Sequence, residues 1–324
     1  MNNKPFLCAF GIRPTGPRGM STTKIVPVAE SEGVTIYCQT DGVFSFFNSP
    51  YIAHRTYSGV DIYMPKEFGE IISSPVLGRV SEIRKVRCPD RREFEASKFD
   101  YVTLIRSVEN PKRMVKILHV KPTVEPGRFV EPGQELGLLL RSGYFDFWTD
   151  PHVHVEVRDP QDPIRARGGF KIKRTLLLND IESLDTEPPR ELRGTVVKVR
   201  REYSLIVLKN SCKYGLPVDV NGSRGILDGG VPHYGWFGIH TSHEPSLGGV
   251  VKLCGAPIGV LKSVFGKTGL AECSGFRLLL GGVKVGFSLY LYPSGRPLVK
   301  VVPPKPGALN LELSEEVRVA VVTS

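Results

Sequence analysis

Short runs of β-branched and apolar residues, separated by turn-forming glycine and proline, recur from Val34 to the end of this chain of 324 residues. The chain holds 34 Gly and 26 Pro, and no amphipathic helix longer than two turns is expected. This pattern is typical of strands joined by tight turns, so we predict an all-β protein. The expected strands are 34–38, 60–63, 79–83, 101–105, 114–120 and 153–158 in the first half, and 194–199, 204–208, 249–253, 284–292 and 317–322 in the second.

Length and one polar stretch indicate two domains. The chain is longer than an ordinary single domain of roughly 100–200 residues. The stretch from Asn179 to Arg190 contains Pro188-Pro189 and is interpreted as a linker. We predict an N-terminal segment with strands at 1–43, a β domain at 44–178, a linker at 179–190 and a β-rich accessory domain at 191–324.

Two turn-rich segments specify the first domain further. Residues 69–80 and 124–137 both place glycines at turns between apolar positions. Small barrel-sandwich folds require such turns where strands cross a corner. We therefore expect a barrel-sandwich hybrid domain, followed by a second β-rich domain.

The charge balance bears on possible partners. The net charge is +10, and basic clusters lie at 84–87, 91–92 and 198–201, so an anionic partner such as nucleic acid is one interpretation. No aromatic-interleaved nucleic-acid motif accompanies these clusters, which favours a solvated basic face. The first twenty residues contain no sustained apolar run, and no stretch approaches the about 20 apolar residues that span a bilayer. We expect a cytoplasmic protein without a membrane span.

The six cysteines are far apart and form no Cys-x-x-Cys pair, so neither a zinc knuckle nor a disulfide scaffold is indicated, and buried thiols are expected. In the second half His233, His240 and His243 match no zinc module. We expect these three histidines in loops.

The segment 151–158 reads Pro-His-Val-His-Val-Glu-Val-Arg. In a strand, side chains alternate with period two, so His152, His154 and Glu156 share one face while the valines pack into the core. Two of the seven histidines of the chain thus point the same way. A metal site is favoured over a merely solvated polar face.

Further motifs follow in a recognisable order. They are Ser-Gly-Val-Asp-Ile-Tyr-Met-Pro at 58–65, Ile-Ser-Ser-Pro at 72–75, Leu-His at 118–119, the paired glycine turns, and the His-Val-His segment. Over about residues 44 to 160 the chain resembles the lysostaphin- and LytM-type zinc metallopeptidases, which have a duplicated hybrid motif in a barrel-sandwich β domain.

The resemblance implies roles for individual residues. It makes Asp61 and His154 ligands of a zinc ion, and His119 and His152 catalytic histidines. It also implies a peptide or protein substrate. In relatives this substrate is often a glycine-rich cross-link of the bacterial cell wall, and the absence of a readable export signal argues against that particular substrate here.

One position departs from the family pattern. The usual His-x-Gly-x-Asp motif would place a histidine where this chain has Tyr57, and a phenol with a pKa near 10 is a poor zinc ligand. His54 is the natural replacement, provided that the chain between it and Asp61 bulges or loops. The alternative is a loop histidine beside a degenerate site. Tyr57 and Glu156 are expected next to the ligands, with a plain surface carboxylate as the open alternative for Glu156.

Three functions remain in view. The first is a zinc-dependent endopeptidase that cleaves peptide bonds through a metal-activated water. The second is a catalytically degenerate member of the same family that acts as a binding or scaffold module, which the tyrosine at position 57 would suggest. The third, ranked behind these, is a basic nucleic-acid-binding β protein.

Overall fold

The computed structural model describes residues 24–91, 94–178, 181, 187–209 and 211–323. Within these residues there are 25 strands and one short helix, α1 (Ile52–Arg55), so the all-β prediction is confirmed. Positions 1–23 of the predicted N-terminal segment, and most of the predicted linker at 179–190, lie outside the described residues.

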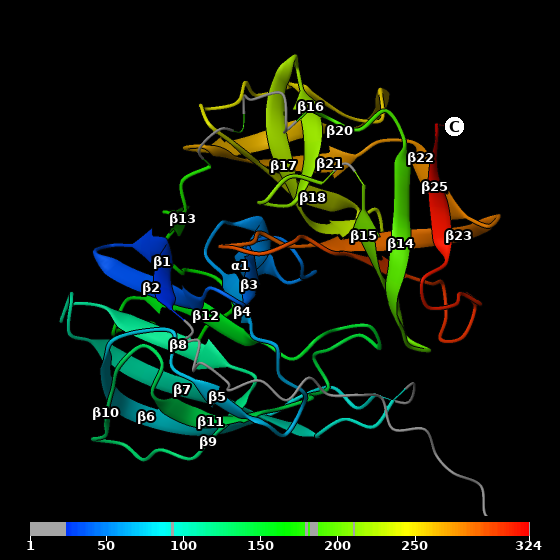
Figure 1. Cartoon of the computed structure of the whole chain (residues 1–324). Helices are drawn as coiled ribbons and strands as arrows, with labels where there is room; N and C mark the ends of the chain where they lie inside the picture. Colours follow the sequence, from blue (N-terminus) through cyan, green and yellow to red (C-terminus); the bar gives the residue numbers. More distant parts are fainter. Residues whose placement is uncertain (1–23, 92–93, 179–180, 182–186, 210, 324) are drawn as a thin grey trace, which may run out of the picture.

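Three sheets build the first half of the chain (Figure 1). One sheet has seven strands in the order β10-β6-β7-β8-β12-β4-β3, and two have three strands in the orders β5-β11-β9 and β13-β1-β2. The strands are β1 (Ile25–Ser31), β2 (Val34–Gln39), β3 (Val43–Ser45), β4 (Val60–Tyr63), β5 (Ile71–Ser73), β6 (Gly78–Arg87), β7 (Phe99–Ser107), β8 (Met114–Leu118), β9 (Val120–Pro122), β10 (Phe129–Val130), β11 (Glu135–Leu139), β12 (Val153–Arg158) and β13 (Lys173–Arg174). Val28, Leu136 and Val155, one from each sheet, belong to one buried core, so the three sheets pack on each other.

The second half consists of one continuous antiparallel sheet that closes on itself twice. Its order is β16-β19-β20-β21-β18-β17-β23-β22-β25-β14-β15-β24, and the additional pairings β16–β17 and β23–β24 close a ring of six strands at each end. The strands are β14 (Leu192–Val199), β15 (Ser204–Leu208), β16 (Leu216–Val220), β17 (Ser223–Val231), β18 (Trp236–Thr241), β19 (Val250–Leu253), β20 (Ala256–Phe265), β21 (Thr268–Cys273), β22 (Phe276–Leu280), β23 (Val283–Leu289), β24 (Val299–Val302) and β25 (Glu316–Thr323). The two rings are joined where β17 pairs with β23.

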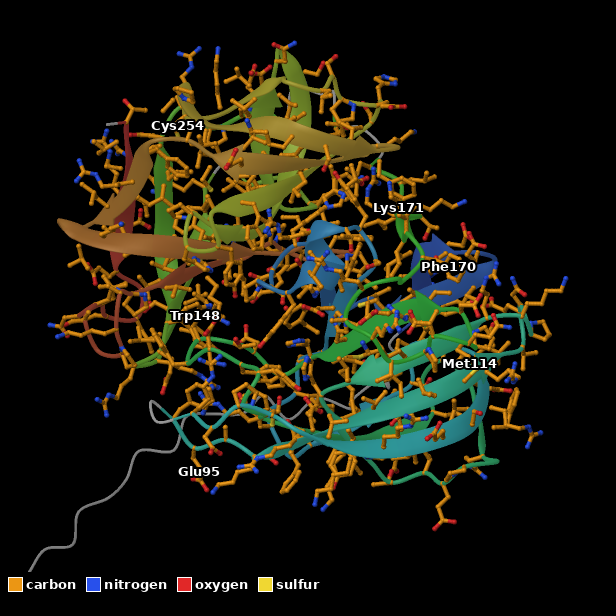
Figure 2. The ribbon with its side chains drawn as sticks, turned by 180° about the vertical axis from the view of Figure 1, so that it is seen from behind. Glu95, Met114, Trp148, Phe170, Lys171 and Cys254 are labelled. Carbon is orange, nitrogen blue, oxygen red and sulfur yellow. The ribbon has the colours of Figure 1, made fainter. Side chains whose placement is uncertain are left out.

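The two halves share a hydrophobic core. Ile226, Leu270 and Leu291 of the second half belong to the same buried cluster as the core of the first half. Figure 1 shows α1 and β3 between the two halves, and Figure 2 shows Trp148 and Lys171 where the halves meet. The ammonium group of Lys171 lies 5.0 Å from the ring centroid of Phe265. The elements at this junction also carry the candidate site.

Each strand expected from the sequence overlaps an observed strand, but others were not expected. The sequence Ser-Arg-Gly-Ile-Leu-Asp-Gly-Gly-Val of β17 contains three glycines, which weakens the strand pattern. Gly229 of this strand has a φ of +107°, and a Cβ there would lie 2.6 Å from the carbonyl oxygen of Phe47. Close approach of another backbone therefore requires glycine inside the strand.

Three minor expectations can be compared with the described residues. Cys38, Cys88 and Cys212 are buried free thiols, while Cys254 and Cys273 are half-buried, and Cys8 lies outside the described residues. His240 lies in strand β18 and is fully buried, so the expectation of a loop histidine was wrong there. In the part of the chain that is described, no helix combines the length and apolar character needed to cross a membrane.

Candidate metal site

The interior position of β12 in the seven-stranded sheet, between β8 and β4, assembles most of the site. In this strand His154 lies opposite Asp61 of β4 on one side and opposite Leu118 of β8 on the other. His119 follows Leu118 directly. Alternation along β12 buries its three valines completely, and His154 and Glu156 come from the opposite set of positions. Antiparallel pairing therefore brings residues distant in sequence to one place.

A helical turn brings His54 to the same place. His54 lies in α1, and the chain then passes through Tyr57, whose φ of +61° is in the left-handed region that few non-glycine residues adopt. The strand with Asp61 begins only at Val60. Between His54 and Asp61 the chain thus forms a helical turn and then passes through one left-handed residue. The side-chain alternation of a straight strand therefore does not apply to this interval.

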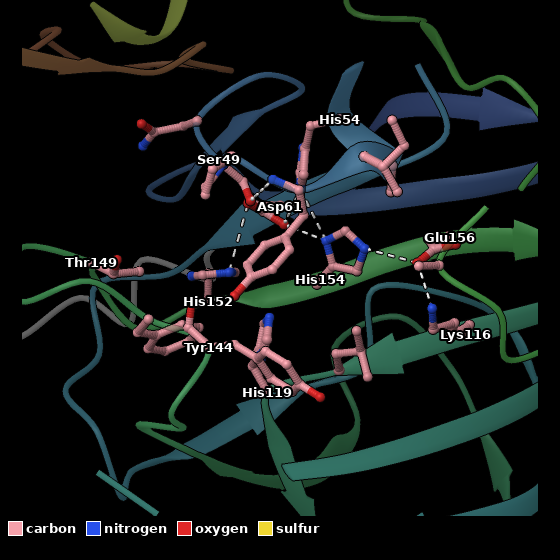
Figure 3. Close-up of a pocket in the computed structure, with 18 of the residues that line it drawn as sticks. Ser49, His54, Asp61, Lys116, His119, Tyr144, Thr149, His152, His154 and Glu156 are labelled. Atoms are coloured by element: carbon pink, nitrogen blue, oxygen red, sulfur yellow. Dashed lines mark hydrogen bonds and ion pairs between the residues drawn. The ribbon is translucent and has the colours of Figure 1, made fainter. Parts of the chain in front are cut away.

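Figure 3 shows the side chains of His54, Asp61 and His154 directed at one another. His154 Nδ1 lies 2.8 Å from Asp61 Oδ1 and 3.2 Å from His54 Nε2. His54 Nε2 lies 3.4 Å from Asp61 Oδ1. All three side chains are buried. Three ligand-type atoms this close together can hold one metal ion in common.

The other ring nitrogen of each of these histidines already has a partner. His54 Nδ1–H donates to the carbonyl oxygen of Phe46 at 2.8 Å, and His154 Nε2–H donates to Glu156 Oε1 at 3.2 Å. Such partners fix the orientation of metal-ligating imidazoles. Glu156 is held in turn by Lys116 Nζ at 2.7 Å and by Arg158 at 3.1 Å.

The electrostatics of the cluster favour a positive charge at its centre. Burial disfavours the charged form of His154, but hydrogen bonds to Asp61 and Glu156 outweigh burial and raise its pKa to about 9. Burial also opposes ionisation of Asp61, yet the nearby imidazoles of His54 and His152 and hydrogen bonds from His154 and His54 hold the pKa of Asp61 well below its usual value. A buried cation is therefore stabilised between two carboxylates.

His152 lies beside the cluster and lines the same cavity (Figure 3). Its Nδ1–H donates to the carbonyl oxygen of Asp150 at 2.9 Å, and its Nε2 lies 3.7 Å from Asp61 Oδ2. Its ring stacks on Phe145 with centroids 4.9 Å apart. Burial lowers the pKa of His152 to about 4 despite the nearby Asp61 carboxylate, which keeps this imidazole neutral at neutral pH.

His119 is held by a carboxylate that the sequence analysis did not single out. Asp100 Oδ2 accepts from His119 Nδ1–H at 2.6 Å, and Asp100 Oδ1 accepts from the backbone N–H of His119 at 3.0 Å. These bonds stabilise the left-handed backbone of His119, whose φ is +68°. Nε2 of His119 is therefore the ring nitrogen that can transfer a proton. The ring centroids of His119 and His152 are 5.0 Å apart.

A cavity of about 310 Å³ opens beside these groups. Aliphatic and aromatic side chains form much of its wall, together with the polar groups already described. The apolar and aromatic residues are Pro50, Tyr51, Ile52, Ala53, Val86, Val102, Leu118, Tyr144, Phe145, Ile164, Ala166 and Tyr234. A mostly apolar cavity with a few convergent polar groups is typical of a small ligand or substrate site.

Tyr57 lies next to the ligand His54 through its backbone, whose N–H donates to the carbonyl oxygen of His54 at 3.3 Å, but its side chain makes other contacts. Its hydroxyl lies 2.8 Å from Ser263 Oγ and accepts from the backbone N–H of Leu270 at 3.1 Å. Both partners belong to the second half of the chain. The side chain of Tyr57, in a residue with a positive φ, therefore links the two halves of the chain.

Several residues of the site went unnoticed in the sequence, although a signal was present. Asp100 and Lys116 of the site, and Lys300 elsewhere, are charged residues next to apolar positions in strands, and all three are buried. Charged residues are almost never buried without a partner. Their occurrence inside strand patterns was therefore a usable indication of buried ion pairs, but it did not identify the partners.

Comparison with known proteins concerns the first half of the chain. No curated protein and no solved structure matches the chain. Residues 35–174, which include His54, Asp61, Asp100, His119 and the whole of β12, are similar to a family described as the N-terminal domain of DUF8155, a domain of unknown function.

Proposed function

We propose that this protein is a zinc-dependent endopeptidase that resembles the lysostaphin type. Its ligands would be His54, Asp61 and His154. The observation that carries the proposal is the convergence of three ligand-type atoms, from three separate segments, at mutual distances of 2.8, 3.2 and 3.4 Å in a buried site.

The donor set and its spacing fit zinc. Ligand atoms about 2.0 Å from a tetrahedral zinc ion lie about 3.3 Å from one another, close to the distances between these atoms. Two imidazoles and one carboxylate leave a fourth position for water or substrate, as in catalytic zinc sites. The carbonyl of Phe46 and the carboxylate of Glu156 would orient the two imidazoles around the ion.

The remaining histidines suit the proton transfers of peptide hydrolysis. When bound, zinc supplies a Lewis acid that polarises a carbonyl group and lowers the pKa of water. His152 and His119 both line the cavity, and each has Nδ1–H engaged by a fixed acceptor, which leaves Nε2 to accept or donate a proton. The carboxylate of Asp100 would stabilise a protonated His119.

The cavity supports a peptide as the substrate class. Its volume of about 310 Å³ is at the lower end of the range for small-ligand sites, which suits one or two residues of an extended peptide. Apolar walls next to the ligand group would accept an uncharged segment around the scissile bond.

Metal analysis tests the zinc site directly. We expect about one zinc ion per chain after purification in zinc-containing buffer, and loss of zinc in both His54→Ala and His154→Ala. Retention of zinc in His54→Ala would contradict the proposed ligand set. Absence of zinc from the unmodified protein would contradict the proposed function as a whole.

Catalysis is tested separately from binding. The zinc-loaded protein is incubated with a mixture of synthetic peptides that includes glycine-rich sequences, and cleavage products are identified by mass spectrometry. We expect His119→Ala and His152→Ala to retain zinc and to lose at least a factor of about 100 in cleavage rate. Zinc binding without cleavage of any peptide would favour the scaffold function over the endopeptidase.

A further inference from the structure

A turn of the first half inserts into the second half next to the metal-ligand group. Phe46 and Phe47 follow β3 and are almost completely buried. A Cβ at Gly238 of β18 would lie 1.9 Å from the Phe47 ring. The ring of His240 lies 5.3 Å from that of Phe46. The second half is thus shaped around this turn.

One carboxylate of the second half holds the turn. Asp228 of β17 is completely buried. Its Oδ1 accepts from Ser45 Oγ–H at 2.5 Å, and its Oδ2 accepts from the backbone N–H of Phe46 at 2.8 Å. His240 Nε2–H donates to the same Oδ2 at 3.0 Å, and Thr268 Oγ1 lies 3.2 Å from His240 Nδ1. Each oxygen of the carboxylate therefore has a fixed donor.

The same turn orients a residue of the ligand group. The backbone N–H of Phe46 donates to Asp228, and the carbonyl oxygen of Phe46 accepts from His54 Nδ1–H. A shift of the Phe46 backbone would move this acceptor, and the proton on Nδ1 is what leaves Nε2 of His54 free to coordinate. Asp228 is thereby connected to the ligand through a single residue.

We propose that Asp228 is a positioning residue for the candidate metal site, and that the second half of the chain acts as a clamp that fixes His54 in its coordinating tautomer and orientation. The zinc part of this inference rests on the proposed function. The predicted effect of Asp228 on the His54 ring does not rest on that function, because the hydrogen bonds between Asp228, Phe46 and His54 form without a metal ion.

The substitution Asp228→Asn changes the least volume and breaks the clamp. Ser45 Oγ accepts from the backbone N–H groups of Phe47 at 3.1 Å and Asn48 at 2.9 Å, so its own proton must go to residue 228. An asparagine side chain would set its NH₂ group against either the Ser45 hydroxyl or the Phe46 N–H. In both orientations two donors face each other.

The matched control is Asp219→Asn. It is the same chemical change on the neighbouring strand β16, where Asp219 Oδ1 accepts from the backbone N–H of Gly222 in a turn. Neither Asp219 nor Gly222 belongs to the turn at Phe46 that supplies the hydrogen-bond acceptor of His54.

Two measurements test the inference. The first is NMR of the metal-free protein labelled with ¹⁵N-histidine, in which signals of His54 are assigned by their loss in His54→Ala. We expect a single Nδ1–H tautomer in the unmodified protein and in Asp219→Asn, and a mixed or broadened signal in Asp228→Asn. The second is zinc affinity by chelator competition, which we expect to fall about tenfold in Asp228→Asn and to stay unchanged in Asp219→Asn.

The outcomes separate this inference from the proposed function. Unchanged His54 signals and unchanged zinc affinity in Asp228→Asn would overturn the positioning role and leave the zinc site standing. If the unmodified protein binds no zinc, the proposed function fails, and the His54 spectrum alone decides the role of Asp228. If Asp228→Asn does not fold, Ser45→Ala, which removes only the hydroxyl, replaces it with the same readouts, and unchanged His54 signals there would overturn the inference.

Discussion

Lys300 offers the sharpest test of how the two halves are held together. This residue of β24 is completely buried, and its Nζ lies 2.6 Å from Asp150 Oδ2. It also donates to the carbonyl oxygen of Trp148. The hydroxyl of Tyr290 donates to the same Asp150 oxygen at 3.1 Å. Because Asp150 accepts from His152 through its own carbonyl, this ion pair also stabilises the segment that carries a proposed catalytic histidine.

The substitution Lys300→Met removes the charge and keeps an aliphatic chain. Breaking a buried ion pair by removing one partner costs about 3–5 kcal/mol, since the other charge is left uncompensated. The Asp150 side chain keeps 25% of its surface exposed, so water relieves part of this cost. We therefore expect the free energy of unfolding to fall by about 3 kcal/mol at pH 7, at the lower end of that range.

The loss should depend on pH in a defined direction. Burial raises the pKa of Asp150, but Lys300 outweighs burial and holds that pKa below its usual value. In the unmodified protein the Lys300–Asp150 ion pair therefore stabilises the fold at neutral pH. This stabilisation is lost as pH falls through the lowered pKa of Asp150. In Lys300→Met only the hydrogen bonds from the hydroxyls of Tyr290 and Tyr203 still oppose burial, so the pKa of Asp150 rises and protonation restores stability as pH falls. The difference between the two proteins should therefore shrink between pH 7 and about pH 4.

Urea unfolding followed by tryptophan fluorescence at both pH values measures this difference. Lys198→Met is the matched control, because this lysine is 42% exposed and 3.8 Å from its partner Glu67. We expect the control to change the free energy of unfolding by no more than about 0.5 kcal/mol. A loss below about 1 kcal/mol in Lys300→Met, or a loss equal at both pH values, would refute the reasoning.

Three further outcomes are expected. Gly59→Ala places a Cβ 2.8 Å from His154 Cε1, so zinc affinity measured by calorimetry should fall at least about tenfold, and an unchanged affinity would contradict the placement of that ring. Tyr57→Phe removes the hydroxyl that contacts Ser263 and should cost about 1 kcal/mol in urea unfolding, while the zinc content of the purified protein stays the same. Removal of zinc with a chelator should lower the thermal midpoint of the unmodified protein, whereas the midpoint of His54→Ala should not respond.

Local patterns predicted the parts of the site that depend on one strand. The alternation of His152, His154 and Glu156 with three valines indicated which side chains share a face, and β12, which begins directly after His152, alternates His154 and Glu156 with the three valines. The spacing of His54 and Asp61 was harder to interpret, because a short helix and one left-handed residue separate them. The sequence indicated a loop there without specifying its form.

Contacts between distant segments could not be obtained from local patterns. Tyr57 stands where a family ligand is expected, and only its contacts with the second half reveal another role. Asp228 lies among glycines in β17, where the glycines themselves conceal the strand. Its partners Ser45 and Phe46 are some 180 residues away along the chain, as the separation of 183 positions from Ser45 shows. Periodicity within a short window cannot report a pairing of this kind.

The closed rings of the second half limit how this protein can meet other molecules. Every strand of β14 to β25 has a neighbour on both sides in the described structure, since the pairings β16–β17 and β23–β24 complete the two circles. Where a strand has two paired neighbours, its backbone amides are not available to an incoming extended peptide, and one-sided stretches remain only at strand ends such as 320–323 of β25. We therefore expect this half to recognise other molecules mainly through side chains and loops.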